Sequence, residues 1–184
     1  FEGCSEITKI ELDKCNKLTN IRYGVFFNCS NLTTISLPES LSEIGRNAFK
    51  ECSLLKTIIL PSNLDKIEAH AFKKCSGLIF INLSTIKNPL EIEMHAFSEC
   101  LNLTTVTFPK SLTKIERYAF YGCSDLNEIN LVECIHLTEI GDSAFAKCTS
   151  LKNVNLPLQP LYPFEIGMSA FSECSKLESI QFHK

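Results

Sequence analysis

The stretch LTTISLPESLSEIGRNAFKEC, residues 32–52, decides the fold because its spacing recurs from one end of the 184-residue chain to the other. The stretch ends in Ala-Phe-x-x-Cys, and a phenylalanine followed three residues later by a cysteine occurs eight times, at intervals of 23 to 26 residues. A unit this short cannot fold alone, so it must bury its apolar edge against its neighbours. The eight pairs are Phe1/Cys4, Phe26/Cys29, Phe49/Cys52, Phe72/Cys75, Phe97/Cys100, Phe120/Cys123, Phe145/Cys148 and Phe171/Cys174.

Apolar residues stand at three fixed places after each cysteine, as Leu55, Ile58 and Leu60 do after Cys52. The last two alternate with a residue that is mostly polar, which is the pattern of a short β-strand with one wet face. We therefore predict that each coil contributes one strand to a parallel β-sheet on one face of the molecule. Together with the period, this predicts a leucine-rich-repeat solenoid of about eight coils of 23–26 residues, a single unit over residues 1–184.

The other half of each coil carries a second set of apolar residues. Four coils leave the strand through proline, which lacks the N–H that pairing needs. A second apolar pair follows, such as Leu41/Ile44, and then the Ala-Phe-x-x-Cys segment. This segment has about one helical turn of inward-facing residues, so we expect a short helical or 3₁₀ turn opposite the sheet. Coils of 25 or 26 residues carry their extra length between the two apolar pairs, as at 84–91 and 158–165, and such insertions belong in surface loops.

The complete pattern, L-x-x-I-x-L-P-x-x-L-x-x-I-x-x-x-A-F-x-x-C in residues 32–52, resembles the BspA-like class of leucine-rich repeat, and the resemblance covers essentially the whole chain. It implies a non-enzymatic protein that binds a protein or a matrix component. Members of the class are typically cell-surface proteins of bacteria and unicellular parasites, and some are adhesins. Coils four and seven are expected to deviate locally, because Leu90/Ile92 and Phe164/Ile166 have a changed spacing.

The composition points neither to nucleic acid nor to a membrane. The formal net charge is −3, the pI is about 5.8, and tryptophan is absent. A basic surface of the kind that binds nucleic acid or anionic lipid is therefore not indicated. No apolar run approaches the roughly 18 residues of a membrane span. We expect no nucleic-acid partner and no membrane insertion by this segment.

Two classes of function remain open, both of them based on protein partners. In the first, the solenoid displays its sheet face to a host or matrix protein at the cell surface or outside the cell. In the second, it is an intracellular scaffold, cytoplasmic or cytoskeletal, which binds neighbouring subunits of a larger assembly. The chain begins in mid-repeat and ends just past a predicted strand, so we expect it to be a segment of a longer chain.

The cysteines are predicted to be reduced thiols. Eight of the ten occupy one position of the repeat, where neighbouring side chains point in parallel into the core and cannot bridge. A buried free cysteine behaves as a small hydrophobe. The other two, Cys15 and Cys134, lie in L-x-x-C-x-x-L-T-x-I and are expected to fill the place of a turn residue. No C-x-x-C occurs, so no structural zinc site is predicted.

Superposition of the coils suggests one metal site. Two imidazoles and two or three carboxylates converging there could hold Zn²⁺ or Ni²⁺. The simpler interpretation is a solvated edge where histidine and glutamate pair electrostatically, and we predict no metal and no cofactor. The sequence has no nucleophile elbow and no phosphate-binding glycine loop, so we predict no enzymatic activity. The residues of the suggested site are Glu68, His70, Glu93, His95, Glu116 and Tyr118.

The exposed side of the strand column is the face best suited to a partner. Its outward positions carry mainly Thr, Ser, Asn and charged residues, apart from Ile59 and Phe80 on adjacent coils. An exposed apolar pair with a polar surround is the usual anatomy of a binding hot spot. The alternative is that the 84–91 loop covers Phe80. The predicted binding residues are Ile59, Phe80, Asn82, Thr105, Thr107, Glu128 and Asn130.

Overall fold

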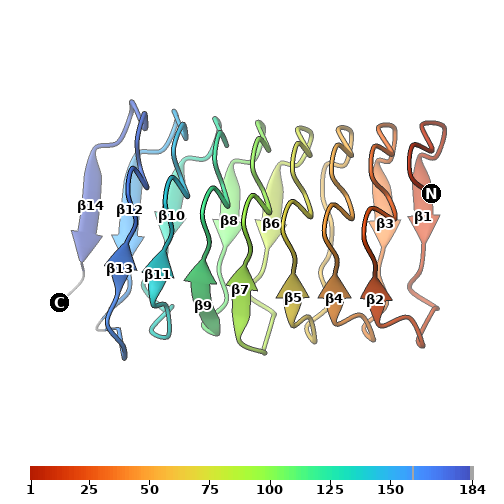
Figure 1. The fold of residues 1–184 in the computed structure, drawn as a ribbon, viewed down its shortest axis with the longest axis horizontal. Helices are drawn as coiled ribbons and strands as arrows, with labels where there is room; N and C mark the ends of the chain where they lie inside the picture. Colours follow the sequence, from red (N-terminus) through yellow and green to blue (C-terminus); the bar gives the residue numbers. More distant parts are fainter. Residues whose placement is uncertain (159, 183–184) are drawn as a thin grey trace.

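The computed structural model describes residues 1–158 and 160–182, which form one elongated solenoid (Figure 1). The coils stack side by side along the long axis, and the two termini lie at opposite ends. Counted from phenylalanine to phenylalanine, Phe1 to Phe171 makes seven full circuits, after which an eighth coil begins. We number the coils 1 to 8 in this way. The solenoid that the repeat predicts is confirmed.

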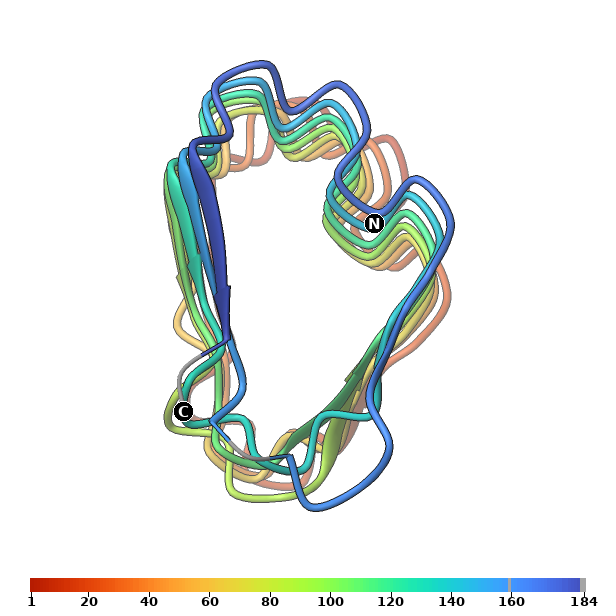
Figure 2. The ribbon, with the colours of Figure 1, turned by 90° about the vertical axis from the view of Figure 1, so that its left-hand side faces the viewer.

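Two faces of the solenoid carry short parallel strands (Figures 1 and 2). Strands pair with the same position of the next coil, as Ile10 does with Ile35. The sequence pattern predicts only the first face. The first face carries β1 (Lys9–Glu11), β3 (Thr34–Ser36), β6 (Phe80–Asn82), β8 (Thr105–Thr107), β10 (Glu128–Asn130), β12 (Asn153–Leu156) and β14 (Ser179–Phe182). The second face carries β2 (Asn20–Ile21), β4 (Glu43–Ile44), β5 (Lys66–Ile67), β7 (Leu90–Ile92), β9 (Leu112–Ile115), β11 (Glu139–Ile140) and β13 (Glu165–Ile166).

The two faces differ in continuity. The strands of the second face form one seven-stranded sheet, whereas those of the first face form three groups, β1–β3, β6–β8 and β10–β12–β14. Residues 57–59 of coil 3 form no strand, although Ile58 is buried like its equivalents in other coils. The first face is therefore interrupted beside Ile59.

The longer coils deviate at the edge between the two faces. In coil 4, the pairing of β7 with β9 shifts register between Leu90 and Glu91, which confirms the deviation expected there. In coil 7, β13 pairs with β11 in the ordinary register. Its extra length lies in the 158–165 segment, of which residue 159 lies outside the described residues.

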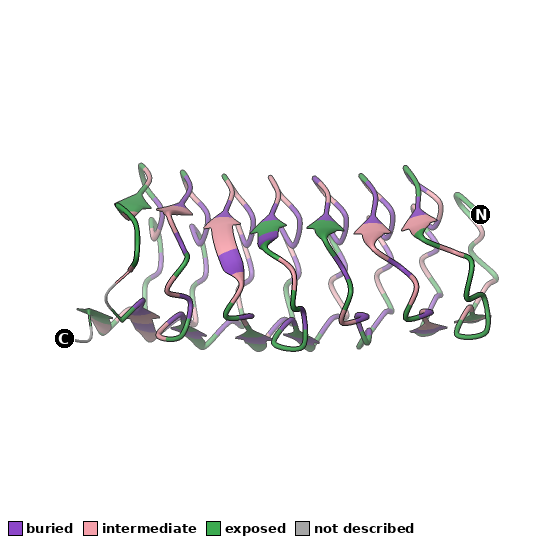
Figure 3. Cartoon of the chain, turned by 90° about the horizontal axis from the view of Figure 1, so that it is seen from below, coloured by how far each residue is buried: buried purple, intermediate pink, exposed green. Residues whose placement is uncertain are grey.

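A column of stacked phenylalanines forms the centre of the core. Neighbouring rings are 5.1–5.7 Å apart between centroids, from Phe1 to Phe171. The six internal phenylalanines are at most 2% exposed, whereas Phe1, which has a neighbour on one side only, is 69% exposed. Buried residues recur at the same places in successive coils (Figure 3). The prediction that the internal phenylalanines are buried is confirmed.

The Ala-Phe-x-x-Cys segments form tight turns, which corrects the expectation of a short helical or 3₁₀ turn. Residues 1–158 and 160–182 contain no helix, and thus none long and apolar enough to cross a membrane. In every complete segment two residues have a left-handed backbone, the second before and the second after the phenylalanine. His95 (φ 57°) and Glu99 (φ 60°) take these places around Phe97. A left-handed residue interrupts a right-handed helix.

Hydrogen bonding between coils explains this backbone. The N–H of Phe97 donates to the carbonyl of Ala119 in the next coil (2.8 Å), and the N–H of Glu99 donates to that of Tyr121 (2.7 Å). The N–H groups that alternate with these bond within their own coil, as that of Ser98 does to His95 (3.1 Å) and that of Cys100 to Phe97 (3.3 Å). Every second N–H thus links neighbouring coils. A helix would keep these donors within one coil and leave the stack without them.

The cysteine column makes a further bond between coils. The thiol of Cys100 donates to the carbonyl oxygen of Phe72 in the preceding coil at 3.2 Å. Seven cysteines, from Cys29 to Cys174, make this bond at 3.0–3.3 Å. The position therefore requires a small, largely apolar side chain that still carries a donor, which is what a thiol provides.

All ten cysteines lie among the described residues and are free thiols, as predicted. Burial raises the pKa of the core thiols, that of Cys52 to about 12. Cys134 is also buried, with its thiol 3.4 Å from the carbonyl oxygen of Pro109, and fills the expected place. Cys15 takes the same place in the turn of coil 1, with main-chain bonds to Leu12 (2.9 Å) and Leu18 (2.8 Å), but its side chain is exposed.

Phe97→Ala is expected to lower the free energy of unfolding by ~3–5 kcal/mol, because it opens a cavity in a fully buried column. Phe80→Ala, which truncates a half-exposed phenylalanine of the first face, is the matched control and is expected to cost about 1 kcal/mol or less. Urea unfolding followed by circular dichroism measures both. Equal losses would contradict the buried column.

A thiol reagent is expected to modify Cys15 first in the native protein, since Cys15 is exposed whereas the thiols of the core are covered. After denaturation without a reductant, the reagent is expected to count all ten thiols. Mass spectrometry of the labelled peptides identifies the order of reaction. A count near zero in the denatured protein would show instead that the cysteines are bridged.

Stability is expected to fall as the pH rises above about 9. The pKa of Cys52 is raised by burial from 9.0 to about 12 in the folded protein, so its contribution is fully present below pH 9 and is lost between pH 9 and 12. Thermal unfolding at a series of pH values measures the decline. Cys52→Ala serves as the control and should show a shallower decline, because one buried thiol no longer ionises. An identical slope would contradict this origin.

Candidate functional site

The first face carries an exposed apolar patch on coils 3 to 5. We call this group the sheet-face patch, and it comprises Leu54, Ile59, Ile79, Phe80 and Leu101. Ile59 is 82% exposed, and the other four are each close to half exposed. The alternative, that the 84–91 loop covers Phe80, is therefore wrong, because nearly half of this side chain is exposed.

Each member of the sheet-face patch is an exception in its own column, meaning the same position in the other coils. The position of Ile59 is polar in every other coil, and so are those of Ile79 and Phe80. The position of Leu101 is otherwise serine or threonine, and that of Leu54 is otherwise polar or glycine. The sequence prediction names only Ile59 and Phe80. Extending the same comparison to the neighbouring columns finds the other three.

Three of the predicted binding residues, Asn82, Thr105 and Thr107, lie beside the patch. Strands β6 and β8 pair Phe80 with Thr105 and Asn82 with Thr107, so these four side chains lie on adjacent coils. Glu128 and Asn130 lie on β10, beyond the break in pairing between β8 and β10. The predicted set is thus gathered on one face, with its polar members toward the C-terminal side of the patch.

The polar members are partly engaged within the protein. The side-chain oxygen of Asn82 accepts a bond from the N–H of Ser84 at 3.0 Å and one from the hydroxyl of Thr107 at 2.6 Å. Ser84 stands where four other coils have proline. Proline has no N–H, whereas the N–H of Ser84 needs an acceptor. Asn130 accepts in the same way from the N–H of Val132 at 3.2 Å. These asparagines shape the turn that follows the strand.

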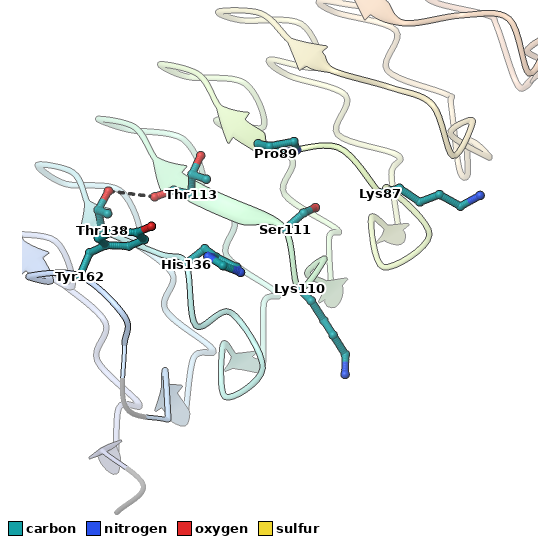
Figure 4. Close-up of a pocket in the computed structure, with 8 residues that line it drawn as sticks. All are labelled: Lys87, Pro89, Lys110, Ser111, Thr113, His136, Thr138 and Tyr162. Atoms are coloured by element: carbon teal, nitrogen blue, oxygen red, sulfur yellow. Dashed lines mark hydrogen bonds between the residues drawn. The ribbon is translucent and has the colours of Figure 1, made fainter.

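A groove of about 600 Å³ lies on the other side of the molecule, where the longer loops of coils 4 and 7 flank coils 5 and 6 (Figure 4). Its floor carries hydroxyls that already donate to the main chain, as Thr138 does to the carbonyl of Thr113 at 3.0 Å. Pro89 lines it from coil 4 and Tyr162 from coil 7. Lys110 is also part of the lining but forms an exposed ion pair with Glu133 outside it. Its size is that of a small-ligand site.

The suggested metal site is not formed. The rings of His70 and His95 stack face to face, with centroids 4.8 Å apart, so their nitrogens do not converge. Glu68 and Glu93 accept bonds from main-chain N–H groups instead, and both pair with Lys66. Burial is the main cause that lowers the pKa of both imidazoles, that of His95 to about 4. Within the described part of the chain, no group of three or more potential ligands could hold a metal ion.

Solved structures similar to this chain are bacterial leucine-rich repeat proteins. A leucine-rich repeat protein of T. pallidum is 28% identical, with a TM-score of 0.75 over 87% of this chain and 72% of its own. One from Bacteroides ovatus is 28% identical, with a TM-score of 0.67 over 98% of this chain and 56% of its own. A leucine-rich cell surface protein of Faecalibacterium prausnitzii is 24% identical, with a TM-score of 0.58, and shares the fold. This chain spans 61% of the Faecalibacterium prausnitzii protein and 56% of the Bacteroides ovatus protein, which is little more than half of each.

A family model matches the sequence, although no curated protein sequence does. The family described as "BspA type Leucine rich repeat region (6 copies)" matches residues 1–91 and again residues 90–184. These two matches cover every coil, including the turn segments and both strand faces. The chain therefore belongs to the BspA-type leucine-rich repeat family.

Proposed function

We propose that this chain is a protein-binding leucine-rich-repeat module that contacts its partner through the sheet-face patch. The observation that carries the proposal is the gathering of Leu54, Ile59, Ile79, Phe80 and Leu101 on three consecutive coils, in columns that are otherwise polar. Scattered apolar residues on a surface are ordinary, but several on consecutive coils, in columns that are otherwise polar, support an interaction site.

The surroundings of the patch suit a protein interface. Asn82, Thr105 and Thr107 border it on the C-terminal side with amide and hydroxyl groups, which can form a polar rim. Glu128 and Asn130 would extend that rim across the next coil. Ile59 and Phe80 would supply the buried centre, because large apolar side chains contribute most when a partner excludes water from them.

The break in the first face supports the same location. Residues 57–59 of coil 3 do not pair as a strand with either neighbour, and Ile59 lies within this segment. Display of the module at a cell surface, which the family resemblance implies, is part of the proposal. The alternative, an intracellular scaffold, would use the same patch against a neighbouring subunit.

The double variant Ile59→Ser and Phe80→Ser is expected not to bind the partner, whereas the wild-type protein binds it. Once the partner is identified, titration of Ile59→Ala and Phe80→Ala should each show a loss of ~1–3 kcal/mol in binding free energy. The reason is that each truncation removes apolar area from the centre of the interface.

Leu161→Ala is the matched control, because Leu161 is also an exposed apolar side chain (59%) but directly precedes Tyr162, which lines the groove of Figure 4. It should leave the affinity unchanged. If Leu161→Ala weakens binding while the Ile59 and Phe80 variants bind normally, the partner uses the groove and the sheet-face patch is not the site. Unfolding curves of all variants check that folding is unaffected.

A further inference from the structure

A shallow trough runs along the turn side of the solenoid, away from the sheet-face patch. Two concavities of about 280 and 480 Å³ form it, and Lys73 lines both. It extends from Tyr23 in coil 1 to Glu173 in coil 8. The same inward bend recurs in every coil (Figure 2), so the trough follows the long axis of the molecule. We call it the turn trough.

A row of stacked rings lines the middle of the turn trough. His70, His95 and Tyr118 occupy the same left-handed position in three successive coils, and their centroids are 4.8 Å apart at both steps. His70 lines the smaller concavity, and His95 and Tyr118 line the larger one. The Tyr118 hydroxyl accepts a hydrogen bond from the Arg117 guanidinium at 3.1 Å. The row therefore places imidazole and phenol rings in both concavities.

Two polar atoms in the turn trough lack any partner within the described protein. The hydroxyl of Ser98 and the Nδ1 of His95 are both buried without a hydrogen bond. Ser98 is fully buried, and both residues line the larger concavity. Buried polar groups are almost always paired, so two adjoining exceptions at one concavity indicate a ligand that supplies the missing partners.

Cations gather in the N-terminal half of the turn trough. The smaller concavity is lined by Arg46, Lys50 and Lys73, and no carboxylate lines it. All three lie close enough to His70 to lower its pKa further, beyond the effect of burial. The Arg46 side chain forms no ion pair with any described residue. The pair between Lys73 and Glu99 (3.4 Å) is partly exposed and contributes little, so an added carboxylate can compete for the lysine.

We propose that the turn trough binds a linear acidic glycan, a chain of sugar units that carry carboxylates. The carboxylates would meet Arg46, Lys50 and Lys73, and the sugar hydroxyls would bond to His95 and Ser98. This site is separate from the sheet-face patch, so the failure of either proposal leaves the other standing.

The main chain of the turns favours a glycan over an acidic peptide. Its N–H groups are committed to the next coil, as that of His95 is to Arg117 (3.2 Å). A peptide would find no strand edge to pair with.

Isothermal titration with a hexasaccharide of galacturonic acid tests the proposal. Two matched probes accompany it, the fully methyl-esterified hexasaccharide, which has the same length and linkage without charge, and a hexaglutamate peptide, which has the same number of carboxylates. We expect saturable binding of the hexauronate, and binding at least about tenfold weaker for the other two, because each charge-assisted hydrogen bond lost costs roughly that factor or more.

Three variants locate the site. Arg46→Gln should weaken binding about tenfold, because it removes one charge-assisted contact. Lys87→Gln is its control, since it removes the same charge from the groove of Figure 4, and it should change the affinity less than about twofold at moderate salt. Ser98→Ala should weaken binding several-fold without lowering the thermal unfolding midpoint, because its hydroxyl has no internal partner to lose.

Four outcomes would overturn the proposal. They are absence of saturable hexauronate binding, equal affinity for the methyl ester, equal affinity for hexaglutamate, and equal weakening by Lys87→Gln and Arg46→Gln. The third would identify the turn trough as a site for acidic peptides, and the fourth would show that binding follows overall charge and not this site. Unaltered affinity in Ser98→Ala with normal folding would also count against the assignment, because the unpaired hydroxyl would then have no role in binding.

Discussion

Hydrogen bonds directed along the solenoid axis, from each coil to the next, are the constraint on which the rest of the structure depends. A coil of 23 to 26 residues has no core of its own, so its backbone donors and its apolar side chains both need a neighbour. The bonds form on three sides of the solenoid, at both strand faces and at the turn segment, although strand pairing on the first face is interrupted at coil 3 and between β8 and β10. They require residue-for-residue register, and register places phenylalanine on phenylalanine and thiol beside carbonyl in every coil.

The same constraint decides which parts of the fold can be predicted from the sequence. The phenylalanine and cysteine columns are predictable because a periodic core must repeat its side chains. The turn segments are not, because the spacing of Ala-Phe-x-x-Cys fits a helical turn equally well. Some left-handed positions carry Gly or Asn, as Gly24 and Asn47 do, but most do not. Glu51, Tyr118 and Lys147 are of residue types that do not indicate a positive φ. The strands of the second face, such as β4, have as few as two residues, too few for an alternating pattern.

Surface residues on strands could likewise be predicted, whereas those in the turns could not. Ile59 and Phe80 could be identified because strand alternation fixes which side chains face outward. Leu101 lies outside the strand, and its exposure becomes evident only when its column is compared with those of other coils. The unpaired hydroxyl of Ser98 could not be foreseen, because it depends on how the turns bend. Sequence reasoning brought His70 and His95 together correctly but could not show that their rings stack instead of converging.

Length differences among the coils are confined to one edge of the molecule. The extra residues of coils 4 and 7 lie between the strand of the first face and that of the second, where the loops flanking the groove of Figure 4 leave the body. An insertion on any of the other three sides would shift every axial hydrogen bond of its coil. Insertions and deletions can therefore accumulate at this edge during evolution while the body stays in register. The groove is the part of the surface whose shape is freest to diverge between related proteins.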